Sequence, residues 1–334
     1  MGDINPKKVT ISDVANYAGM SIATVSRVIN RQGAVREETR LKVYDAIQAL
    51  GYKSNVQFED SESQQLIIIV LPDIDNPFYS RIVAGIHSCA KSHNAKYFIY
   101  ICPNVDASFK NLLDFINFTK ASGIILLSPT TNKQVLDAID AAAPLVQCTE
   151  YNEQSDLPYV SIDDYAASKS GIEFMLSKGK KQIAIFCGPA DYKYARQRLQ
   201  GYLDTLKANG IEPNPSLIFH LNEVLFEPAL SVATQVLSSP NKPDAVFCVS
   251  DIFAAAVVKA ATLLNISIPS ELGVLGFDNT YISTIGTPTV SSISQPQYDL
   301  GYYACEILME RIANPCIPHR HIFLRTELII RESL

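Results

Sequence analysis

Residues 9–30 read VTISDVANYAGMSIATVSRVIN. The caps and the apolar spacing of this stretch predict two short helices joined by a tight turn. Thr10, followed three residues later by Asp13, is typical of a capping box, and Ser21 is placed to cap the second helix. Gly19 tolerates the left-handed conformation that commonly ends a helix. Apolar residues recur at helical spacing at Ile11, Val14, Ala15, Ala18, Val25, Val28 and Ile29. The stretch therefore predicts a helix-turn-helix.

The outward face of the second helix has the chemistry of a DNA-reading surface. Arg27 suits bidentate pairing with guanine, while Ile22 and Ala23 suit apolar contacts with thymine methyl groups. Short hydrogen-bonding side chains suited to phosphate oxygens occur at Ser21, Thr24, Ser26 and Asn30. A third helix is predicted over residues 37–50, with a packing set at Leu41, Val43, Tyr44, Ile47 and Leu50, and it stops at Gly51.

The charge of the chain is divided unevenly. The whole chain carries a net charge of −6, which by itself argues against a nucleic-acid binder. Residues 1–55, however, hold eight Lys and Arg against five Asp and Glu, a net charge of +3. The remaining 279 residues hold 20 basic and 29 acidic groups, a net charge of −9. We therefore expect a basic headpiece (residues 1–55) that faces DNA and an acidic body (residues 66–334) with other tasks.

The chain shows no targeting segment, membrane span or metal motif. Its N-terminus has no apolar signal region, and the longest apolar run, Leu66–Leu71, has only the length of a strand. Seven dispersed cysteines without a C-x-x-C pair are typical of reduced, mostly buried thiols. His319 and His321 alone are too few for a metal site. We therefore expect a cytoplasmic protein with no membrane partner, no cofactor and no bound metal.

From Leu66 onward, short apolar strands alternate with amphipathic helices, which predicts an α/β body with parallel sheets covered on both faces. Strands are expected at 66–71, 96–101, 123–127, 145–148, 182–187, 244–249 and 273–277. Helices are expected at 78–93, 166–178, 195–209, 227–237, 253–264 and 299–313, among others. A change near residues 150–165 indicates two doubly wound lobes.

Ligands of doubly wound folds bind beyond the carboxyl ends of the strands. Aromatic, acidic and basic side chains follow the predicted strand ends at Phe78, Tyr79, Asp163, Tyr192, Tyr194, Arg198, Asp251 and Asp278. Aromatic faces stack on a ring, and carboxylates or an arginine bind hydroxyls. For Asp163 and Asp251, capping of the following helix is an equal alternative. Ligand contact is favoured for Phe78, Arg198 and Asp278.

The headpiece closely resembles the DNA-binding segment of the LacI/GalR repressors. The shared motif is V-T-I-S-D-V-A-x-x-A-G-x-S-x-x-T-V-S-R-V-I-N, followed by T-R-x-x-V and by Gly51-Tyr52. The resemblance covers more than forty residues in register. It implies that Ile22, Ala23 and Arg27 read bases. It also implies that a polar set lies near phosphates, namely Thr10, Ser21, Thr24, Ser26, Asn30 and Arg40.

The resemblance continues through the body, which looks like the type-I periplasmic-binding-protein fold of these regulators. Its motifs include P-D-I-D-N-P-F-Y-S, R-L-Q-G-Y, L-G-V-L-G-F-D-N, S-I-S-Q-P and E-L-I-I-R-E-S. It implies an effector site lined by Phe78, Tyr79, Asp163, Tyr192, Tyr194, Arg198, Phe226 and Asp278. The match looks closest to the cytidine-responsive branch of the family. That branch implies a nucleoside effector and a cyclic-AMP receptor protein as a partner on DNA.

Residues 56–65 form the predicted linker, and they depart from the family pattern. Family members usually carry a hinge helix here whose leucine enters the minor groove. This stretch has no proline and no such leucine, and Glu59, Asp60 and Glu62 would repel phosphate. We therefore expect loosely tethered headpieces that tolerate variable half-site spacing. In the body, one lobe is expected over residues 66–163 plus 294–324 and the other over 164–293 plus 325–334.

Three function classes are weighed. Catalysis is disfavoured because the chain has no nucleotide-binding glycine motif, nucleophile elbow or metalloprotease motif. A transport-binding protein would need an export signal, and it would not need the headpiece. A repressor remains, with a nucleoside effector preferred over a sugar. No heptad segment follows Glu327–Leu334, so we expect a homodimer that reads a pseudo-palindromic operator in double-stranded DNA.

Overall fold

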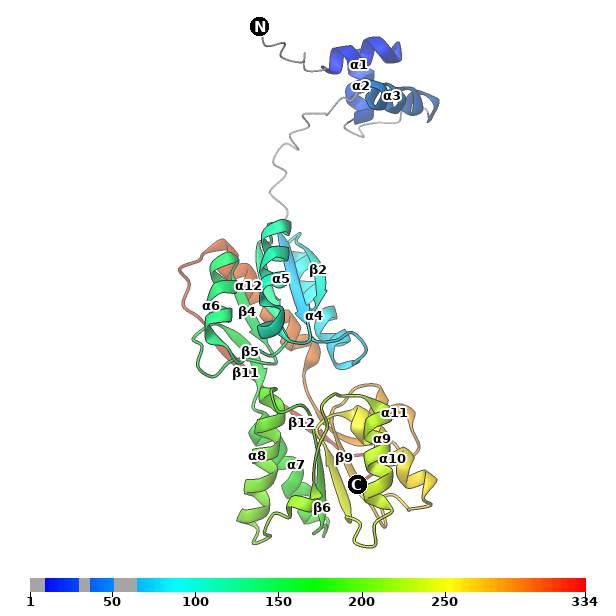
Figure 1. Cartoon of the computed structure of the whole chain (residues 1–334), viewed down its shortest axis with the longest axis vertical. Coiled ribbons are helices and arrows are strands. Elements are labelled where there is room, and N and C mark those ends of the chain that lie inside the picture. The colour runs from blue at the N-terminus through cyan, green and yellow to red at the C-terminus, as the bar shows by residue number, and fades with distance from the viewer. Residues whose placement is uncertain (1–9, 30–36, 51–64) are drawn as a thin grey trace. The chain divides into compact units, whose positions relative to one another are not determined.

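We analysed a computed structural model of the chain, which describes residues 10–29, 37–50 and 65–334. The chain divides into two compact units, residues 1–63 and 64–334, and each is considered by itself. The predicted linker, residues 56–65, falls almost wholly outside the described residues. The predicted fold class is confirmed: a small helical unit precedes a body of two α/β lobes (Figure 1).

The small unit contains α1 (Ile11–Ala18), α2 (Ile22–Ile29) and α3 (Glu37–Leu50). The capping box is present, since the Thr10 and Asp13 side chains each accept a hydrogen bond from the other residue's backbone N–H. Gly19 ends α1 with a φ of 65°. The core of the unit is made by Val14, Ala15, Val25, Val28, Val43 and Ala46. Of these, Ala46 was not among the predicted packing residues.

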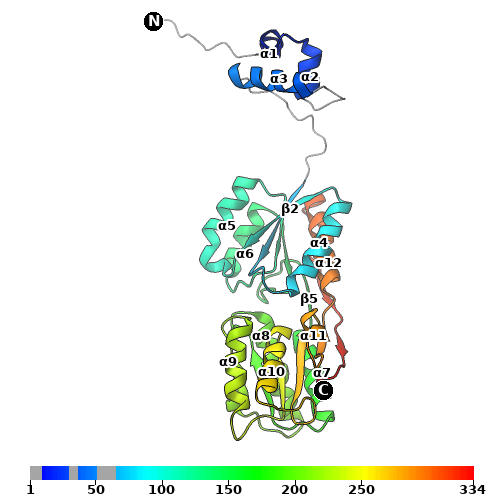
Figure 2. The ribbon, with the colours of Figure 1, turned by 90° about the vertical axis from the view of Figure 1, so that its right-hand side faces the viewer.

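The first lobe is a six-stranded parallel sheet with helices on both faces. The strand order is β11-β5-β4-β3-β1-β2. The strands are β1 (Leu66–Leu71), β2 (Lys96–Ile101), β3 (Gly123–Leu126), β4 (Leu145–Cys148), β5 (Tyr159–Ile162) and β11 (His321–Leu324). The helices are α4 (Phe78–Ser92), α5 (Val105–Thr119), α6 (Lys133–Ala142) and α12 (Gln297–Ala313). Figure 2 shows α4 beside α12 and α5 near α6.

Alternate residues of β1 point to opposite faces of this sheet. Ile67, Ile69 and Leu71 pack with residues of α4 and α12, while Ile68 and Val70 pack with residues of α5 and α6. Both faces of the strand are thus buried. This explains why its sequence is a continuous apolar run instead of an alternating one.

The second lobe repeats the plan with the strand order β12-β10-β9-β8-β6-β7, in which only β12 is antiparallel to its neighbour. The strands are β6 (Ile183–Cys187), β7 (Ile218–His220), β8 (Ala245–Cys248), β9 (Gly273–Asp278), β10 (Ser291–Ser294) and β12 (Glu327–Ile329). The helices are α7 (Asp164–Ser177), α8 (Lys193–Ala208), α9 (Phe226–Leu237), α10 (Asp251–Leu263) and the short α11 (Ile282–Ile285), with a 3₁₀ turn at Pro215–Leu217.

The chain passes between the lobes three times. It passes from β5 to α7 around residue 163, from β10 to α12 at residues 295–296, and from β11 to β12 at residues 325–326. Each connection is only one or two residues long. Three short segments of backbone therefore join the lobes, and all of them lie close to the ends of the sheets.

Several elements differ from the sequence expectations. The helices at 166–178, 195–209 and 253–264 begin two residues earlier than predicted, at Asp164, Lys193 and Asp251. The elements α5, α6, α11, β7, β10, β11 and β12 were not among those expected from the sequence. The edge strand β11 alternates between exposed and half-buried residues, so it lacks the apolar run that marked the inner strands. Among the described residues, no helix has both the length and the apolarity needed to cross a membrane.

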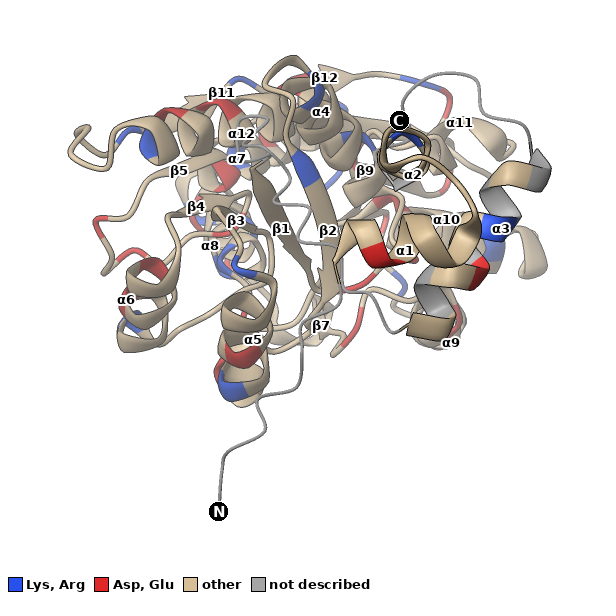
Figure 3. Cartoon of the chain, turned by 90° about the horizontal axis from the view of Figure 1, so that it is seen from above, with Lys and Arg blue, Asp and Glu red and all other residues tan. Residues whose placement is uncertain are grey.

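Charged residues of the body are spread over its surface. Figure 3 shows acidic positions on α5 and α6 and on other parts of the body, interspersed with basic ones. On α6, for example, Lys133 donates to Asp137 at 2.7 Å across one helical turn. Exposed pairs of this kind contribute little to stability. The dispersed charge is therefore consistent with a solvated surface.

Two glycines let α4 and α12 approach closely. A Cβ atom on Gly85 of α4 would lie 2.0 Å from the carbonyl oxygen of Tyr298. A Cβ atom on Gly301 of α12 would lie 2.0 Å from the carbonyl oxygen of Ile82. Both obstacles are backbone atoms, which cannot rotate away. Glycine is therefore required at both positions by helix packing and not by backbone conformation.

We predict that Gly301→Ala lowers the free energy of unfolding of the body by about 1–3 kcal/mol, because the helices must separate to admit the methyl group. This loss is expected even though alanine is the better helix former. Urea unfolding monitored by circular dichroism measures the change. Gly286→Ala is the control, because a Cβ atom there meets nothing closer than 3.6 Å. Equal stability of the two variants would contradict the packing argument.

Candidate functional site

The first candidate surface is the outward face of α2. Ile22 is 50% exposed, although isoleucine side chains are usually buried. Ala23 and Arg27 are exposed beside it on α2. Val25 and Val28 lie on the opposite face, in the core. The three residues predicted to contact bases therefore share one solvent-facing surface. This is the arrangement required for entry into a major groove.

The predicted phosphate contacts are arranged around the helix ends. Thr10 caps α1, and the Ser21 hydroxyl accepts a hydrogen bond from the backbone N–H of Thr24 at 3.1 Å. The hydroxyls of Ser21 and Thr24 also lie 2.8 Å apart, within hydrogen-bonding distance. Ser26 is half-buried. Asn30 and the side chain of Arg40 lie outside the described residues.

The second candidate site is a cavity of about 390 Å³ in the body. Residues from both lobes line it, and most of them follow the carboxyl ends of strands, as expected for doubly wound sheets. Its lining includes Asp73, Asp75, Asn76, Phe78, Tyr79, Glu150, Asp164, Tyr192, Tyr194, Arg198, Asn222, Ser250, Asp278 and Gln295. Six of these residues were predicted as ligand contacts, namely Phe78, Tyr79, Tyr192, Tyr194, Arg198 and Asp278. A cavity therefore lies at the edge of the sheets where the cleft was expected.

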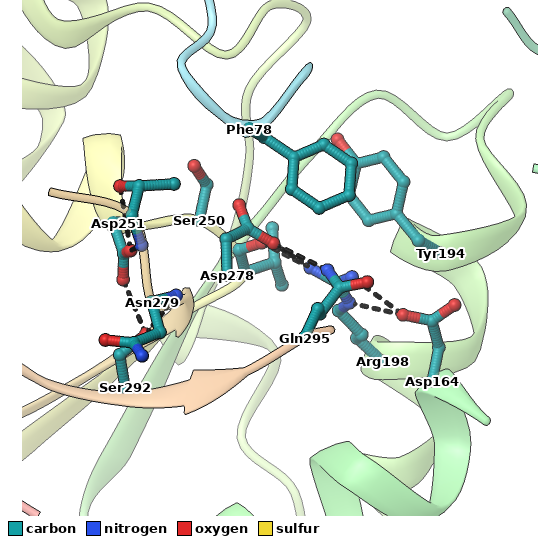
Figure 4. A network of polar contacts seen from close by, with 12 residues as sticks. Phe78, Asp164, Tyr194, Arg198, Ser250, Asp251, Asp278, Asn279, Ser292 and Gln295 are labelled. Atoms are coloured by element: carbon teal, nitrogen blue, oxygen red, sulfur yellow. Dashed lines mark hydrogen bonds and ion pairs between the residues drawn. The ribbon is translucent and has the colours of Figure 1, made fainter. Parts of the chain in front are cut away.

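Arg198 lies at the centre of the polar part of this cavity, and it is only 4% exposed. Its Nε donates to Asp164 at 2.8 Å, and its Nη1 donates to the carbonyl oxygen of Val249 at 2.6 Å. The guanidinium carbon lies 3.4 Å from the ring centre of Phe277 and 4.7 Å from that of Tyr194. Figure 4 shows Arg198 between Asp164 and Asp278. The guanidinium is therefore held in one orientation before any ligand arrives.

The carboxyls of Asp164 and Asp278 respond differently to Arg198. Burial alone would raise the pKa of Asp164, but ion pairs with Lys193 and Arg198 outweigh it and hold that pKa below its usual range. Burial raises the pKa of Asp278 well above its usual range, because Arg198 lies at a longer 3.7 Å and opposes burial less. Asp164 is thus a permanent counter-ion. Asp278 is the carboxyl whose partners a ligand can change.

Asp278 ends β9 with a φ of 99°. Gln295 donates to its Oδ1 at 2.7 Å, and Gln297 donates to its backbone oxygen at 2.5 Å. Figure 4 shows Asp278 facing Gln295 and Arg198. Gln297 thus holds the strained backbone and Gln295 holds the carboxyl, both from the connection between β10 and α12 or its end. This arrangement aims the carboxyl into the cavity.

Aromatic rings from the two lobes flank the cavity. Phe78 and Tyr79 begin α4 with their rings edge to face at 5.3 Å. Tyr192 and Tyr194 lie at the start of α8 with the same separation and a similar geometry. Burial raises the pKa of each of these tyrosines, so the phenols stay protonated and can donate hydrogen bonds. The rings offer flat apolar surface beside polar groups.

Three predicted effector contacts do not line the cavity. Asp163 is exposed, and its carboxylate accepts from the backbone N–H of Ala166 at 2.8 Å, so it is the helix cap that was the alternative reading. Phe226 begins α9 and packs against the core. Asp251 is buried beneath the site, where it accepts hydrogen bonds from Thr280 and Ser292. Burial raises its pKa to about 6.

A buried lysine, Lys193, lies beside Arg198 and was not expected from the sequence. Lys193, at 1% exposure, donates from Nζ to Asp164 at 2.7 Å and to Ser161 at 2.9 Å. Glu150 of the first lobe accepts from the backbone N–H groups of Lys193 and Tyr194, which begin α8 in the second lobe. The available signal was the doublet Asp163-Asp164. One aspartate caps the helix and the next turns inward, but the sequence does not say which.

This geometry suits binding of a small polar molecule. The fixed guanidinium, the Asp278 carboxyl and the tyrosine hydroxyls can bond to hydroxyl groups, while the rings contact a flat apolar face. Both lobes supply contacts. A bound molecule therefore connects them, and it can favour one relative arrangement of the lobes over another.

Comparisons with known proteins cover both the headpiece and the body. The family described as "Bacterial regulatory proteins, lacI family" matches residues 10–55. The family described as "Periplasmic binding protein-like domain" matches residues 172–334. The HTH-type transcriptional repressor CytR of Escherichia coli strain K12 is 30% identical over 330 residues, which are 97% of this chain and 96% of that protein.

Solved structures give the same result. A transcriptional regulator CelR–cellobiose complex superposes with a TM-score of 0.74 at 25% identity, covering 98% of this chain and 100% of that one. The lac repressor dimer bound to operator and the anti-inducer ONPF has a TM-score of 0.74 at 26% identity, covering 98% of this chain and 99% of that one. The similarity thus extends over the headpiece and the body together.

We predict that Asp164→Asn lowers the free energy of unfolding by about 3–5 kcal/mol, because it leaves two buried cations without their shared counter-ion. Asp163→Asn should change it by less than about 1 kcal/mol, because asparagine also caps helices well. Urea unfolding of the two neighbouring variants checks the assignment. A larger loss for the Asp163 variant would reverse the roles given to these residues.

Proposed function

Because this chain belongs to the lacI family of bacterial regulatory proteins, we propose that it represses transcription under the control of a nucleoside such as cytidine. The chain is a DNA-binding transcription regulator with an effector-binding body, and its relatives are regulators and not enzymes. The proposal concerns the class of the effector, a nucleoside. The observation that carries it is the pairing of aromatic rings from both lobes with the buried Arg198 and Asp278.

The two halves of a nucleoside correspond to the two kinds of surface in the cavity. A base is flat on both faces, so Phe78 of the first lobe and Tyr194 of the second suit its stacking. A ribose presents adjacent hydroxyls, which Arg198 and Asp278 suit by charge-assisted hydrogen bonds. The resemblance to the cytidine-responsive branch supports the same choice.

A sugar effector is the second candidate. It is favoured by the similarity to the regulator CelR, whose structure is a complex with cellobiose. Rings and carboxyls also bind sugars, and the cavity of about 390 Å³ does not separate the two classes by size. The two classes differ in how they use the aromatic rings of the cavity, because the base of a nucleoside has two flat faces that rings can cover.

Control of DNA binding requires that the effector prefer one arrangement of the lobes. Phe78 and Tyr79 belong to the first lobe, while Tyr192, Arg198 and Asp278 belong to the second. A ligand held by both sets changes the balance between arrangements. A coupling of roughly 1–3 kcal/mol, about 5- to 150-fold in operator affinity, is typical of such systems.

The proposed assembly is a homodimer on DNA in the bacterial cytosol. A symmetric dimer would read a pseudo-palindromic operator, and a headpiece with a net charge of +3 has modest affinity for phosphate by itself. Two headpieces together would supply the affinity. The lac repressor neighbour is described as a dimer bound to operator. A cyclic-AMP receptor protein as a partner on the same DNA follows from the resemblance to the cytidine-responsive branch.

Isothermal titration calorimetry of the full chain with cytidine, adenosine, ribose and cellobiose tests the effector. We expect heat from a nucleoside and much weaker binding of ribose, which lacks the base. Asp278→Asn should weaken nucleoside binding about 10- to 100-fold through loss of a charge-assisted hydrogen bond. The matched control is Asp163→Asn, which should bind normally because Asp163 lies outside the cavity. Binding of cellobiose alone would overturn the nucleoside proposal in favour of a sugar.

Arg27 tests the DNA surface. An operator selected from random duplexes serves as the probe in fluorescence anisotropy. We expect Arg27→Ala to reduce discrimination between operator and scrambled duplex by about 1–3 kcal/mol, because a bidentate contact is lost. Arg27→Lys keeps the charge and should lose discrimination while retaining salt-sensitive binding to the scrambled duplex. Unchanged discrimination in both variants would remove Arg27 from base reading.

A further inference from the structure

The packing of α4 against α12 brings together three side chains of types that commonly bind metals. Cys89 lies in the last turn of α4, His93 is the residue that caps its C-terminus, and Glu306 lies on α12. Their candidate ligand atoms all lie within 4.8 Å of one another. Residues four apart share one face of a helix, so the cysteine and the histidine point to the same side. The cluster lies outside the lining of the effector cavity.

Two of the three distances are close to those between ligands of one metal ion. Cys89 Sγ lies 3.7 Å from Glu306 Oε1, and His93 Nε2 lies 3.4 Å from the same oxygen. Around tetrahedral zinc, with bonds of about 2.0–2.3 Å, two ligand atoms are about 3.3–3.5 Å apart. The ligand atoms of the remaining pair, Cys89 and His93, lie within 4.8 Å of each other, so binding an ion would require these two side chains to move closer together.

Burial and charge also favour a cation. Cys89 is fully buried, whereas the His93 and Glu306 side chains are 39% and 31% exposed. An ion can therefore enter from solvent and reach the Cys89 thiol behind it, which would lose its proton on binding the metal. A thiolate and a carboxylate balance the charge of a divalent ion. The set of one sulfur, one imidazole and one carboxylate favours Zn²⁺ over Mg²⁺, which prefers oxygen ligands.

We propose that Cys89, His93 and Glu306 form a zinc site with a fourth position open to solvent. The site departs from the sequence analysis, which expected no metal. The spacing Cys89–His93 is short, but the third ligand lies 213 positions after His93 and is brought in only by helix packing. No local motif could reveal it.

The position of the site gives it a mechanical consequence. At its N-terminus, α4 begins with Phe78 in the effector cavity, and α12 begins two residues after Gln295, which lines the same cavity. Cys89 and His93 lie at the other end of α4. An ion there joins the two helices that lead away from the effector site, so it should stabilise the first lobe.

The test uses the full chain, stripped with a chelator and kept reduced, titrated with ZnCl₂ by calorimetry. We expect one equivalent to bind and MgCl₂ to give no heat at the same concentration. His93→Gln and Glu306→Gln should each weaken zinc binding at least tenfold. Both positions are partly exposed, so these variants should fold, and circular dichroism checks this. Cys89→Ser should also abolish the thiolate charge-transfer absorption of the Co²⁺ form.

The control variants are Cys316→Ser and His321→Gln, which change an exposed thiol and an exposed imidazole away from the cluster. Both should bind zinc like the wild type. Zinc binding that persists in His93→Gln and Glu306→Gln, or that is lost in the Cys316 or His321 variant, would overturn the site. Absence of zinc binding to the wild-type chain would overturn it as well. All cysteines and histidines of the chain lie after residue 86, so the headpiece offers no competing thiol or imidazole.

Discussion

The buried guanidinium of Arg198 is the constraint on which the proposed effector site depends. A charge that is 4% exposed needs a permanent partner, and Asp164 supplies it, with Lys193 on the other side of the same carboxyl. Glu150 then fixes the start of α8, which carries Lys193, Tyr194 and Arg198. Because the partners of Arg198 are settled within the protein, only the more distant Asp278 is left to adapt to a ligand.

The same physical reasoning separates residues that bind from residues that support. Asp163, Asp251 and Asp278 all follow strand ends in the sequence, and each is a reasonable ligand contact by type. In the structure, Asp163 caps a helix and Asp251 ties Thr280 to Ser292. Only Asp278 lines the cavity. The chemistry of the side chain is the same in all three cases, so the surroundings decide the role.

How much was predictable follows from how local each signal is. The headpiece was predictable because Thr10, Asp13 and Gly19 act within a few residues of one another. The inner strands were predictable because Ile67 to Val70 are buried on both faces of the sheet. The contact between Glu150 and the start of α8 was not predictable, because Glu150 and Lys193 belong to different lobes. Nothing near either residue in the sequence announces the other.

The connection between β10 and α12 gives the effector a direct means of acting on the lobes. Gln295 lies in that connection and donates to the Asp278 carboxyl, while Gln297, the first residue of α12, donates to the Asp278 backbone. A ligand that bonds to Asp278 competes with Gln295 for the same carboxyl. Any such exchange alters the hydrogen bonds at one of the three connections between the lobes, so the proposed effector would act where the lobes are joined.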